Sequence, residues 1–352
     1  MIYKMLINDI ISDRKIKIFG AGMSGCYLAK LLDNEGIDYE ICDIRRFPDC
    51  RCAFGISDWD TFKKLMKEIG YNAKDYVIAE PKNIKTNVID FNYYVPIIDK
   101  MKLLTDLWNE LNVKRKSEIR VRDNDIVIDA TGYKRALLPK ISNDILVPCY
   151  QIRCKTNLND NNIYAYVSKD AKGYAWAFPL DEEWHVGAGH LDGVNEAKKL
   201  ILKLIKYYEV KITRPSCKCY GYVRHLPPSK CLPFINENVV GVGESIGAIT
   251  MVGAGNVTTL ESSKILYDCL IKDELHSYEE RVIDHFKVSE LEYKIAETYA
   301  NGNKLESIKL LTHWTLLKMK EGKFNVNDII RGFKLIKSYI LGKGNVIKEV
   351  KE

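Results

Sequence analysis

A short apolar run followed by three closely spaced glycines constrains this chain more than any other stretch. Residues 15–32 read KIKIFGAGMSGCYLAKLL, which predicts a strand, a Gly-x-Gly-x-x-Gly loop and a helix. In such a loop Gly20 makes a tight turn, Gly22 lets the backbone approach a pyrophosphate, and Gly25 permits close helix–strand packing. The helix N-terminus then faces the anion. The pattern indicates a dinucleotide site rather than a tight turn that binds no nucleotide.

An acid at the end of the next predicted strand supports this interpretation. The strand DYEICD ends at Asp43, eighteen residues beyond Gly25, close to the spacing of about twenty expected for a ribose-binding acid. Ile44, Arg45 and Arg46 follow, and the arginines could reach a phosphate or an adenine ring. The alternative for the two arginines is a solvated loop.

Two later segments repeat the strand–loop pattern. Residues 125–132, DIVIDATG, end a strand in small residues that let a backbone lie close to a nucleotide. Residues 238–256, NVVGVGESIGAITMVGAGN, predict a strand, an acid that could bind sugar hydroxyls, and a glycine-rich entry to a helix. Each could be an ordinary turn, but three in this order are hard to explain by packing. The candidate residues are Ala130, Thr131, Gly132, Gly243, Glu244, Gly253, Gly255 and Asn256.

The pattern of predicted strands and helices divides the chain into regions. Residues 1–147 and 236–272 alternate strands and helices, which predicts an α/β nucleotide-binding domain with a parallel sheet. Residues 148–235 contain short aromatic and β-branched runs with Gly and Asn-Asp punctuation, which predict an inserted α+β domain of antiparallel strands. Residues 273–352 predict a basic helical region.

Aromatic alternation marks one strand of the predicted inserted domain. Residues 174–189 read YAWAFPLDEEWHVGAG, and the alternation places Tyr174, Trp176 and Phe178 on one face of a strand. A strand packed in the core would explain this pattern, because one face of such a strand is buried. The wall of a pocket for a long apolar ligand would also explain the choice of flat, stiff rings.

These segments together resemble the FAD-dependent geranylgeranyl reductase family, within the flavoproteins shaped like para-hydroxybenzoate hydroxylase. The family motif is Tyr-x-Trp-x-Phe-Pro, seven or eight residues, then Gly-x-Gly, and here it is matched from Tyr174 to Gly189. A second match is Cys52-Ala53, after the ribose acid. A third is the helix IDKMKLLTDL, where Lys100 replaces the usual arginine. The resemblance covers roughly residues 15–265.

The resemblance implies an FAD-dependent oxidoreductase that reduces carbon–carbon double bonds in isoprenoid chains of membrane lipids or their precursors. It implies that Cys52 is catalytic, as a proton donor or redox partner, against the alternative of a small buried hydrophobe. The implied FAD-binding residues are Gly20, Ala21, Gly22, Ser24, Gly25, Asp43, Ile44, Arg45, Cys52, Ala53, Lys100, Ala130, Thr131, Gly132, Gly243, Glu244, Gly253, Gly255 and Asn256. The implied substrate-binding residues are Tyr174, Trp176, Phe178, Pro179, Gly187 and Gly189.

Several cysteines and histidines are interpreted as ordinary residues. Cys50 and Cys52 are too close in sequence for an unstrained disulfide. The ten cysteines do not form a disulfide framework, and no metal site is expected. His185 and His190 flank the Gly-x-Gly motif but are predicted to be strand or loop residues rather than catalytic ones.

Charge is concentrated at the C-terminal end. The net charge is +6, and residues 301–352 hold eleven Lys/Arg and five Asp/Glu, which accounts for all of it. This regional excess favours a local anionic partner and argues against nucleic-acid binding. Residues 324–341 predict a basic amphipathic helix, which would either lie on an anionic membrane or pack on its own domain. We expect a cytoplasmic protein with peripheral membrane contact.

The sequence leaves other functions open. A flavin monooxygenase could use the same scaffold, and so could a lipid-binding protein whose flavin is not catalytic. The chain shows no nicotinamide fingerprint apart from the FAD loop, so the electron donor could be ferredoxin, reduced flavin or NADPH.

Overall fold

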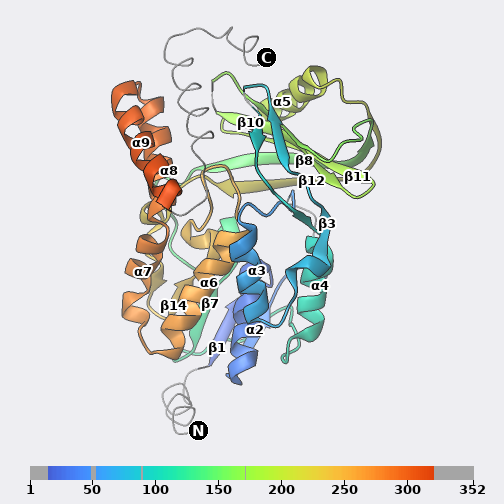
Figure 1. Ribbon diagram of the computed structural model, residues 1–352. Coiled ribbons are helices and arrows are strands. Elements are labelled where there is room, and N and C mark those ends of the chain that lie inside the picture. The colour runs from blue at the N-terminus through green and yellow to red at the C-terminus, as the bar shows by residue number, and fades with distance from the viewer. Residues whose placement is uncertain (1–14, 49–52, 89, 171, 321–352) are drawn as a thin grey trace.

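The computed structural model describes residues 15–48, 53–88, 90–170 and 172–320. Its lower half in Figure 1 is built on a five-stranded sheet of order β13-β14-β7-β1-β2. Four of these strands are parallel, and only β13 runs antiparallel to its neighbour. The strands are β1 (Ile16–Phe19), β2 (Tyr39–Cys42), β7 (Ile126–Asp129), β13 (Ile235–Asn236) and β14 (Val239–Gly241).

Helices cover this sheet and form the larger core. The helix α2 (Met23–Glu35) follows the first glycine loop and packs against α6 (Asn256–Ile271), which comes from far along the chain. Two more helices, α3 (Trp59–Glu68) and α4 (Lys100–Glu110), complete this half. The helix predicted from IDKMKLLTDL begins only at Lys100, because Ile97–Ile98 forms β6 and pairs with β3 (Val77–Ala79). The predicted α/β architecture, a mainly parallel sheet with helices packed on it, is confirmed.

The second half is a seven-stranded sheet of order β12-β8-β11-β10-β9-β4-β5. It is antiparallel apart from the parallel pair β4 and β9. Two of its strands come from residues 83–92, so the expected domain at 148–235 does not contain the whole sheet. The strands are β4 (Asn83–Thr86), β5 (Phe91–Asn92), β8 (Leu146–Thr156), β9 (Ile163–Val167), β10 (Gly173–Leu180), β11 (Glu183–His190) and β12 (Ile212–Arg224).

One face of the second sheet is covered by α5 (Val194–Tyr207) (Figure 1). Alanines at 175, 177 and 188 on this face are fully buried, and small side chains there let the helix pack close to the sheet. Because side chains alternate along a strand, the aromatic residues of β10 lie on the opposite face. That face is directed toward the half built on the five-stranded sheet.

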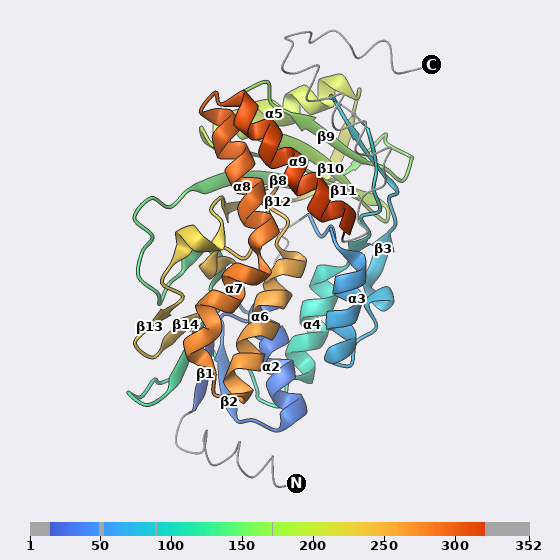
Figure 2. The same ribbon diagram turned by 60° about the vertical axis from the view of Figure 1, so that its left-hand side comes forward.

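The chain continues as helices along one side of the molecule (Figure 2). These are α7 (Tyr278–His285), α8 (Lys287–Ala300) and α9 (Lys304–Lys320). In that view α7 and α8 run from the five-stranded sheet toward the second sheet, where the chain turns back and α9 packs against α8. The predicted amphipathic helix at 324–341 lies outside the described residues. Among the described helices, none is both long and apolar enough to cross a membrane. Short 3-10 helices are η1 (Ala73–Tyr76), η2 (Gly132–Lys134), η3 (Pro228–Cys231), η4 (Gly243–Ile246) and η5 (Leu275–Ser277).

Candidate functional site

One large cavity, with a volume of about 2780 Å³, lies between the two sheets. Single ligand pockets usually enclose about 300–1,000 Å³, so this cavity has room for a cofactor together with a second ligand. Its walls include the loops after β1, β2, β7 and β14, the aromatic face of the second sheet, and residues of α8 and α9. The predicted cofactor and substrate segments therefore share one space.

The glycines of the first loop are required by close backbone contacts. A Cβ added at Gly20 would lie 2.3 Å from the Ala130 carbonyl oxygen, and one added at Gly25 would lie 1.9 Å from the Gly20 carbonyl oxygen. Gly20 also has a φ of +107°. Gly22 precedes α2 without a side-chain cap, so the first amides of this helix are available to an anion. Gly22 and Ser24 line the cavity.

The predicted ribose acid is held by its neighbours. The Asp43 carboxylate accepts a hydrogen bond of 2.8 Å from the Ala21 amide, and the Arg45 guanidinium pairs with both of its oxygens. Burial alone would raise the pKa of Asp43, but hydrogen bonds and charge from Arg45 outweigh it and lower the pKa. Ile44, beside it, is 83% exposed and lines the cavity.

The loop after β7 is shaped by a buried acid. Asp129 accepts hydrogen bonds from the Thr131 amide and hydroxyl and from the amides of Leu137 and Leu138. These bonds fold the loop back so that Ala130, Thr131 and Gly132 line the cavity.

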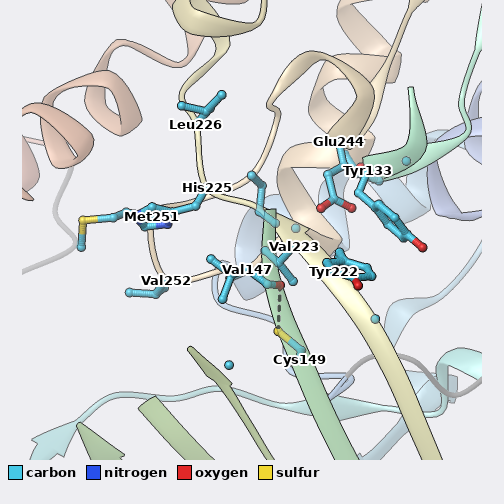
Figure 3. Close-up of a pocket in the computed structure, with 18 of the residues that line it drawn as sticks. Tyr133, Val147, Cys149, Tyr222, Val223, His225, Leu226, Glu244, Met251 and Val252 are labelled. Carbon is cyan, nitrogen blue, oxygen red and sulfur yellow. Dashed lines mark hydrogen bonds between the residues drawn. The ribbon is translucent and has the colours of Figure 1, made fainter. Parts of the chain in front are cut away.

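Glu244 reaches the same wall from η4 (Figure 3). Its Oε1 accepts a 2.8 Å hydrogen bond from the Arg224 amide. Burial raises the pKa of Glu244, although the Arg224 hydrogen bond and charge act against it. The carboxyl group can thus retain a proton more readily than an exposed glutamate.

Sequence reasoning missed two buried arginines that hold this region together. Arg224 is 1% exposed; its guanidinium pairs with Asp144 and donates to the carbonyls of Glu244 and Tyr133. Arg135 donates to three carbonyls, those of Pro139, Ser245 and Pro233. Local periodicity contains no signal for either role, because all their partners except Pro139 are distant in sequence.

Lys100 and Asn256, two of the predicted cofactor-binding residues, lie in one chain of hydrogen bonds. The Lys100 ammonium donates to Asn256 Oδ1 at 2.8 Å, and Asn256 Nδ2 donates to the Gly55 carbonyl at 3.0 Å. Lys100 is the first residue of α4 and Asn256 the first of α6. Gly253 and Gly255 line the cavity just before α6. These hydrogen bonds join the start of α4, the start of α6 and the segment at Gly55 at one wall of the cavity.

The aromatic face of β10 forms the opposite wall. Tyr174, Trp176 and Phe178 all line the cavity, so these rings are a pocket wall as well as strand residues. The Trp176 indole N–H donates to Gln151 Oε1 at 2.9 Å, which fixes the ring. Phe178 rests on Gly55, where an added Cβ would lie 2.9 Å from the ring.

The other residues of the Tyr-x-Trp-x-Phe-Pro motif lie differently from the expectation. Pro179 points to the face of α5 by strand alternation and is not among the cavity-lining residues described. A Cβ at Gly187 would meet the Trp176 ring at 2.7 Å, and one at Gly189 would meet Cys149 Sγ at 2.9 Å. Both glycines therefore make room for neighbouring side chains. Only Gly189 of the pair lines the cavity.

Cys50 and Cys52 lie outside the described residues, but Ala53, the next residue, lines the cavity. His185 is fully buried against Phe54, with ring centroids 4.8 Å apart. Burial, and then the charge of Arg153, lower the pKa of His185 to about 4, which fits a neutral structural histidine.

Within the described part of the chain, one group has the geometry of metal ligands. Atoms of Asp170, His190 and Asp192 lie within 4.8 Å of one another. The Lys172 ammonium pairs with Asp192, which supplies the group with a cation of its own.

The residues of the first wall fit a dinucleotide such as FAD. The open N-terminus of α2 offers amides to a pyrophosphate, the close contacts at Gly20 and Gly25 exclude a larger residue, and Asp43 stands at the end of β2. The same cavity continues past these loops to the second sheet.

Comparisons with known proteins agree with this architecture. A geranylgeranyl bacteriochlorophyll reductase-like protein from Thermoplasma acidophilum superimposes with a TM-score of 0.64 at 15% identity, over 82% of this chain and 88% of that one. A probable FAD-dependent monooxygenase, pqsL from Pseudomonas aeruginosa, gives 0.59 at 14% identity, over 86% and 99%. Klebsiella pneumoniae HpxO, solved with FAD and uric acid, gives 0.59 at 14% identity, over 92% and 97%.

Sequence comparison adds one relative. An uncharacterized protein of Methanocaldococcus jannaschii, MJ1182, is 28% identical over 84% of this chain and 94% of its own length. No protein-family model matches the chain. The structural likenesses, all at low identity, establish that this chain has the fold of FAD-dependent oxidoreductases of the reductase and monooxygenase kinds.

Proposed function

We propose that this protein is an FAD-dependent reductase of carbon–carbon double bonds in isoprenoid chains. The observation that carries the proposal is that Tyr174, Trp176 and Phe178 line the same cavity as the Gly20–Gly25 loop and the start of α6. An apolar chain held on the aromatic face would lie next to a cofactor held on the opposite wall. FAD as the cofactor is part of this proposal.

The residues of the first wall would bind FAD in an extended form. The amides at the start of α2 would hold the pyrophosphate, and Asp43 would bind the ribose after Arg45 releases one of its oxygens. Glu244 and the loop at Ala130–Gly132 would contact the ribitol side. Lys100 and Asn256 would lie near the flavin ring. These roles use the positions of the residues on the cavity wall.

The second wall suits a long apolar substrate. Cavity-lining residues come from β4, β9, β10, β11, β8 and β12, six neighbouring strands of the sheet. Strands in a sheet are about 4.8 Å apart, so the face extends for about 24 Å. Rigid rings hold an isoprenoid chain with large contact area and little loss of entropy, and they exclude water from it.

Reduced FAD, when bound, supplies a hydride to one alkene carbon, and the other carbon requires a proton. We propose Cys52 as the residue that supplies or relays this proton, because its neighbour Ala53 lines the cavity. The Cys149 thiol also lines the cavity, but burial raises its pKa to about 12, so it is a poor acid. The proposed reaction also needs an external electron donor to reduce the FAD.

Turnover of a defined lipid tests the proposal. The purified protein, loaded with FAD and reduced by dithionite under anaerobic conditions, should convert a geranylgeranyl lipid to products heavier by steps of 2 Da in mass spectrometry. A requirement for oxygen and a gain of 16 Da would instead identify a monooxygenase, a function favoured by the likeness to pqsL. A protein that binds no FAD would contradict the proposal.

Variants of the aromatic face test the substrate site separately. Trp176→Leu should raise KM about tenfold through lost ring contact while the affinity for FAD stays unchanged. Tyr166→Leu is the control, because Tyr166 lies on the other face of the sheet, against Tyr207. Equal effects of the two substitutions on KM would remove the aromatic face from the substrate site.

We also propose that α9 contacts a lipid surface. Leu305 and Leu316 are 70% and 53% exposed, and a spacing of eleven residues puts them on one side of the helix. The neighbouring His313 and Leu317 line the cavity. The net charge of +6 over residues 301–352 complements an anionic bilayer.

Vesicle flotation tests this contact. Wild-type protein should float with vesicles of anionic phospholipid and less with neutral ones, and the double variant Leu305→Asp/Leu316→Asp should float less. Leu202→Asp is the matched control, since Leu202 is 65% exposed on α5. If the double variant floats as well as the wild type, this side of α9 does not contact the vesicle. It would then be available to another partner, such as residues 321–352 of the same chain.

A further inference from the structure

The loop at residues 250–255 lies between the two walls of the cavity. It connects η4 to α6, and Met251, Val252, Gly253, Ala254 and Gly255 all line the cavity. Its internal hydrogen bonds centre on Thr250: the Gly253 amide donates to the Thr250 carbonyl at 2.9 Å, the Ala254 amide to the Thr250 hydroxyl at 3.0 Å, and the Thr250 amide to the Ala254 carbonyl at 3.3 Å. These bonds close a turn, and contacts with other segments hold that turn in place.

The second sheet supplies one of these attachments. The Tyr174 hydroxyl donates to the Val252 carbonyl at 2.6 Å. Val252 itself is 55% exposed, so little packing fixes this part of the loop. This hydrogen bond joins β10, which carries the aromatic face, to the loop that leads into α6.

The C-terminal helices supply a weaker attachment. The Tyr293 hydroxyl of α8 lies 3.4 Å from the Thr250 carbonyl, near the upper limit for a hydrogen bond. The Tyr293 ring packs edge-to-face on His225, with centroids 5.2 Å apart. This contact anchors Tyr293 to the end of β12, whereas the Tyr174 ring packs on Trp176 at 5.4 Å. The His225 ring, directly after β12, is itself hydrogen-bonded to the Met251 backbone. The Tyr174 hydrogen bond differs from these contacts because it joins the loop to β10, the strand that carries Trp176 and Phe178.

We propose that Tyr174 is a positioning residue that couples occupation of the aromatic face to the conformation of the 250–255 loop. A ligand that contacts Trp176 and Tyr174 fixes the Tyr174 ring, and the hydroxyl then fixes the Val252 carbonyl. Because this loop leads into Asn256, which bonds to Lys100 and Gly55, the effect reaches the wall assigned to the cofactor. This step rests on the proposed function for the identity of the two ligands.

Hydrogen–deuterium exchange of residues 250–256 measures the attachment directly. In the ligand-free protein, Tyr174→Phe should speed exchange of the Gly253 and Ala254 amides about three- to tenfold, the range expected from the net contribution of one hydrogen bond. Tyr293→Phe should have a smaller effect. Tyr222→Phe is the matched control, because Tyr222 lines the cavity and its ring packs on Tyr133. Exchange in Tyr174→Phe equal to that in wild type would overturn the proposal.

The same measurement with a ligand tests the coupling. Geranylgeraniol in detergent, added to the FAD-loaded protein, should slow exchange of the loop in wild type and in Tyr222→Phe, but not in Tyr174→Phe. Equal protection in all three proteins would overturn the coupling. If FAD or geranylgeraniol fails to bind wild type, the proposed function and the coupling both fail, while the ligand-free exchange still shows whether Tyr174 holds the loop.

Discussion

The glycine loop after β1 and the glycines beside the aromatic face make different contacts. After β1, Gly20 and Gly25 bring backbone against backbone, with no space for a single added carbon. In the seven-stranded sheet, Gly187 makes room for the Trp176 ring, and Gly221 has no atom within 4 Å of an added Cβ. The first loop is thus fixed by main-chain contacts, and the surroundings of Trp176 are shaped by side chains.

This difference shows where the protein can vary. A loop that presents amides to a cofactor keeps its geometry whatever substrate is used, because the backbone makes the contacts. A wall made of side chains can change its shape by substitution without disturbing the fold. Under the proposed function, the loop after β1 is thus expected to be intolerant of change, and the aromatic face to determine specificity.

The largest effect is expected where the two regions meet. Arg224→Met should lower the free energy of unfolding by about 3–5 kcal/mol, because it leaves Asp144 and two carbonyls without their partner in a buried setting. Lys264→Met, which removes a surface pair with Asp268, should cost less than about 1 kcal/mol. Urea titrations monitored by circular dichroism measure both. Similar losses in the two variants would contradict a buried role for Arg224.

A pair of glycine substitutions tests the contrast itself. Gly25→Ala should lower the free energy of unfolding by about 2–3 kcal/mol through overpacking against Gly20 and should abolish FAD binding. Gly221→Ala in β12 should change stability by less than about 0.5 kcal/mol, because the added carbon meets open space. Thermal unfolding and FAD titration give the comparison. If Gly25→Ala leaves stability and FAD binding unchanged, the contrast between the two glycine sites is contradicted.

The two regions should also lose stability in different pH ranges. His185, in the second sheet, has a pKa lowered to about 4 by burial and by Arg153. It is neutral when folded, so its contribution is present above its unfolded pKa of about 6.5 and is lost as the pH falls toward 4. Between pH 6.5 and 4, the free energy of unfolding of the wild type should fall by about 2 kcal/mol more than that of His185→Leu. A constant difference between the two proteins from pH 7 to 4 would argue against the buried neutral histidine.

The smallest effect is expected from Glu40 in β2. Hydrogen bonds from Lys116 and Lys17 lower its pKa to about 2. The folded pKa lies below the unfolded one, so the stabilisation is present above pH 4.5 and disappears as the pH falls toward 2. Glu40 is 27% exposed, and we expect Glu40→Gln to cost only about 1 kcal/mol at pH 7. Unfolding titrations at pH 7, 4 and 2.5 should show the difference shrinking.

Much of the nucleotide-binding half could be predicted from sequence, because its signals are local. The spacing of Gly20, Gly22 and Gly25, and the position of Asp43 after them, follow from one strand–loop–helix unit and the next strand. The placement of Tyr174, Trp176 and Phe178 on one face follows from strand alternation, and their position on the cavity agrees with the pocket-wall interpretation. The role of Cys52 stays a prediction.

Other features depend on contacts between segments that are distant in sequence. The pairing of β4 with β9 places residues 83–86 in the second sheet, and no local pattern specifies that pairing. The Gly-x-Gly pair was expected to admit a ligand, but Gly187 faces Trp176 because β10 and β11 pair residue 176 with 187. The closure of the cavity by α8 and α9 likewise follows from packing.

The sequence by itself thus determined the local elements: the glycine loop, the strand periodicities and the charge of the C-terminal end. These depend on residues within a few positions of one another. Only the tertiary structure decided that Arg224 and Arg135 are buried, that Tyr174 reaches the Val252 carbonyl, and that both walls enclose one cavity. The physical reason is that burial and hydrogen-bond partners are set by the folded packing of remote segments, which no local pattern encodes.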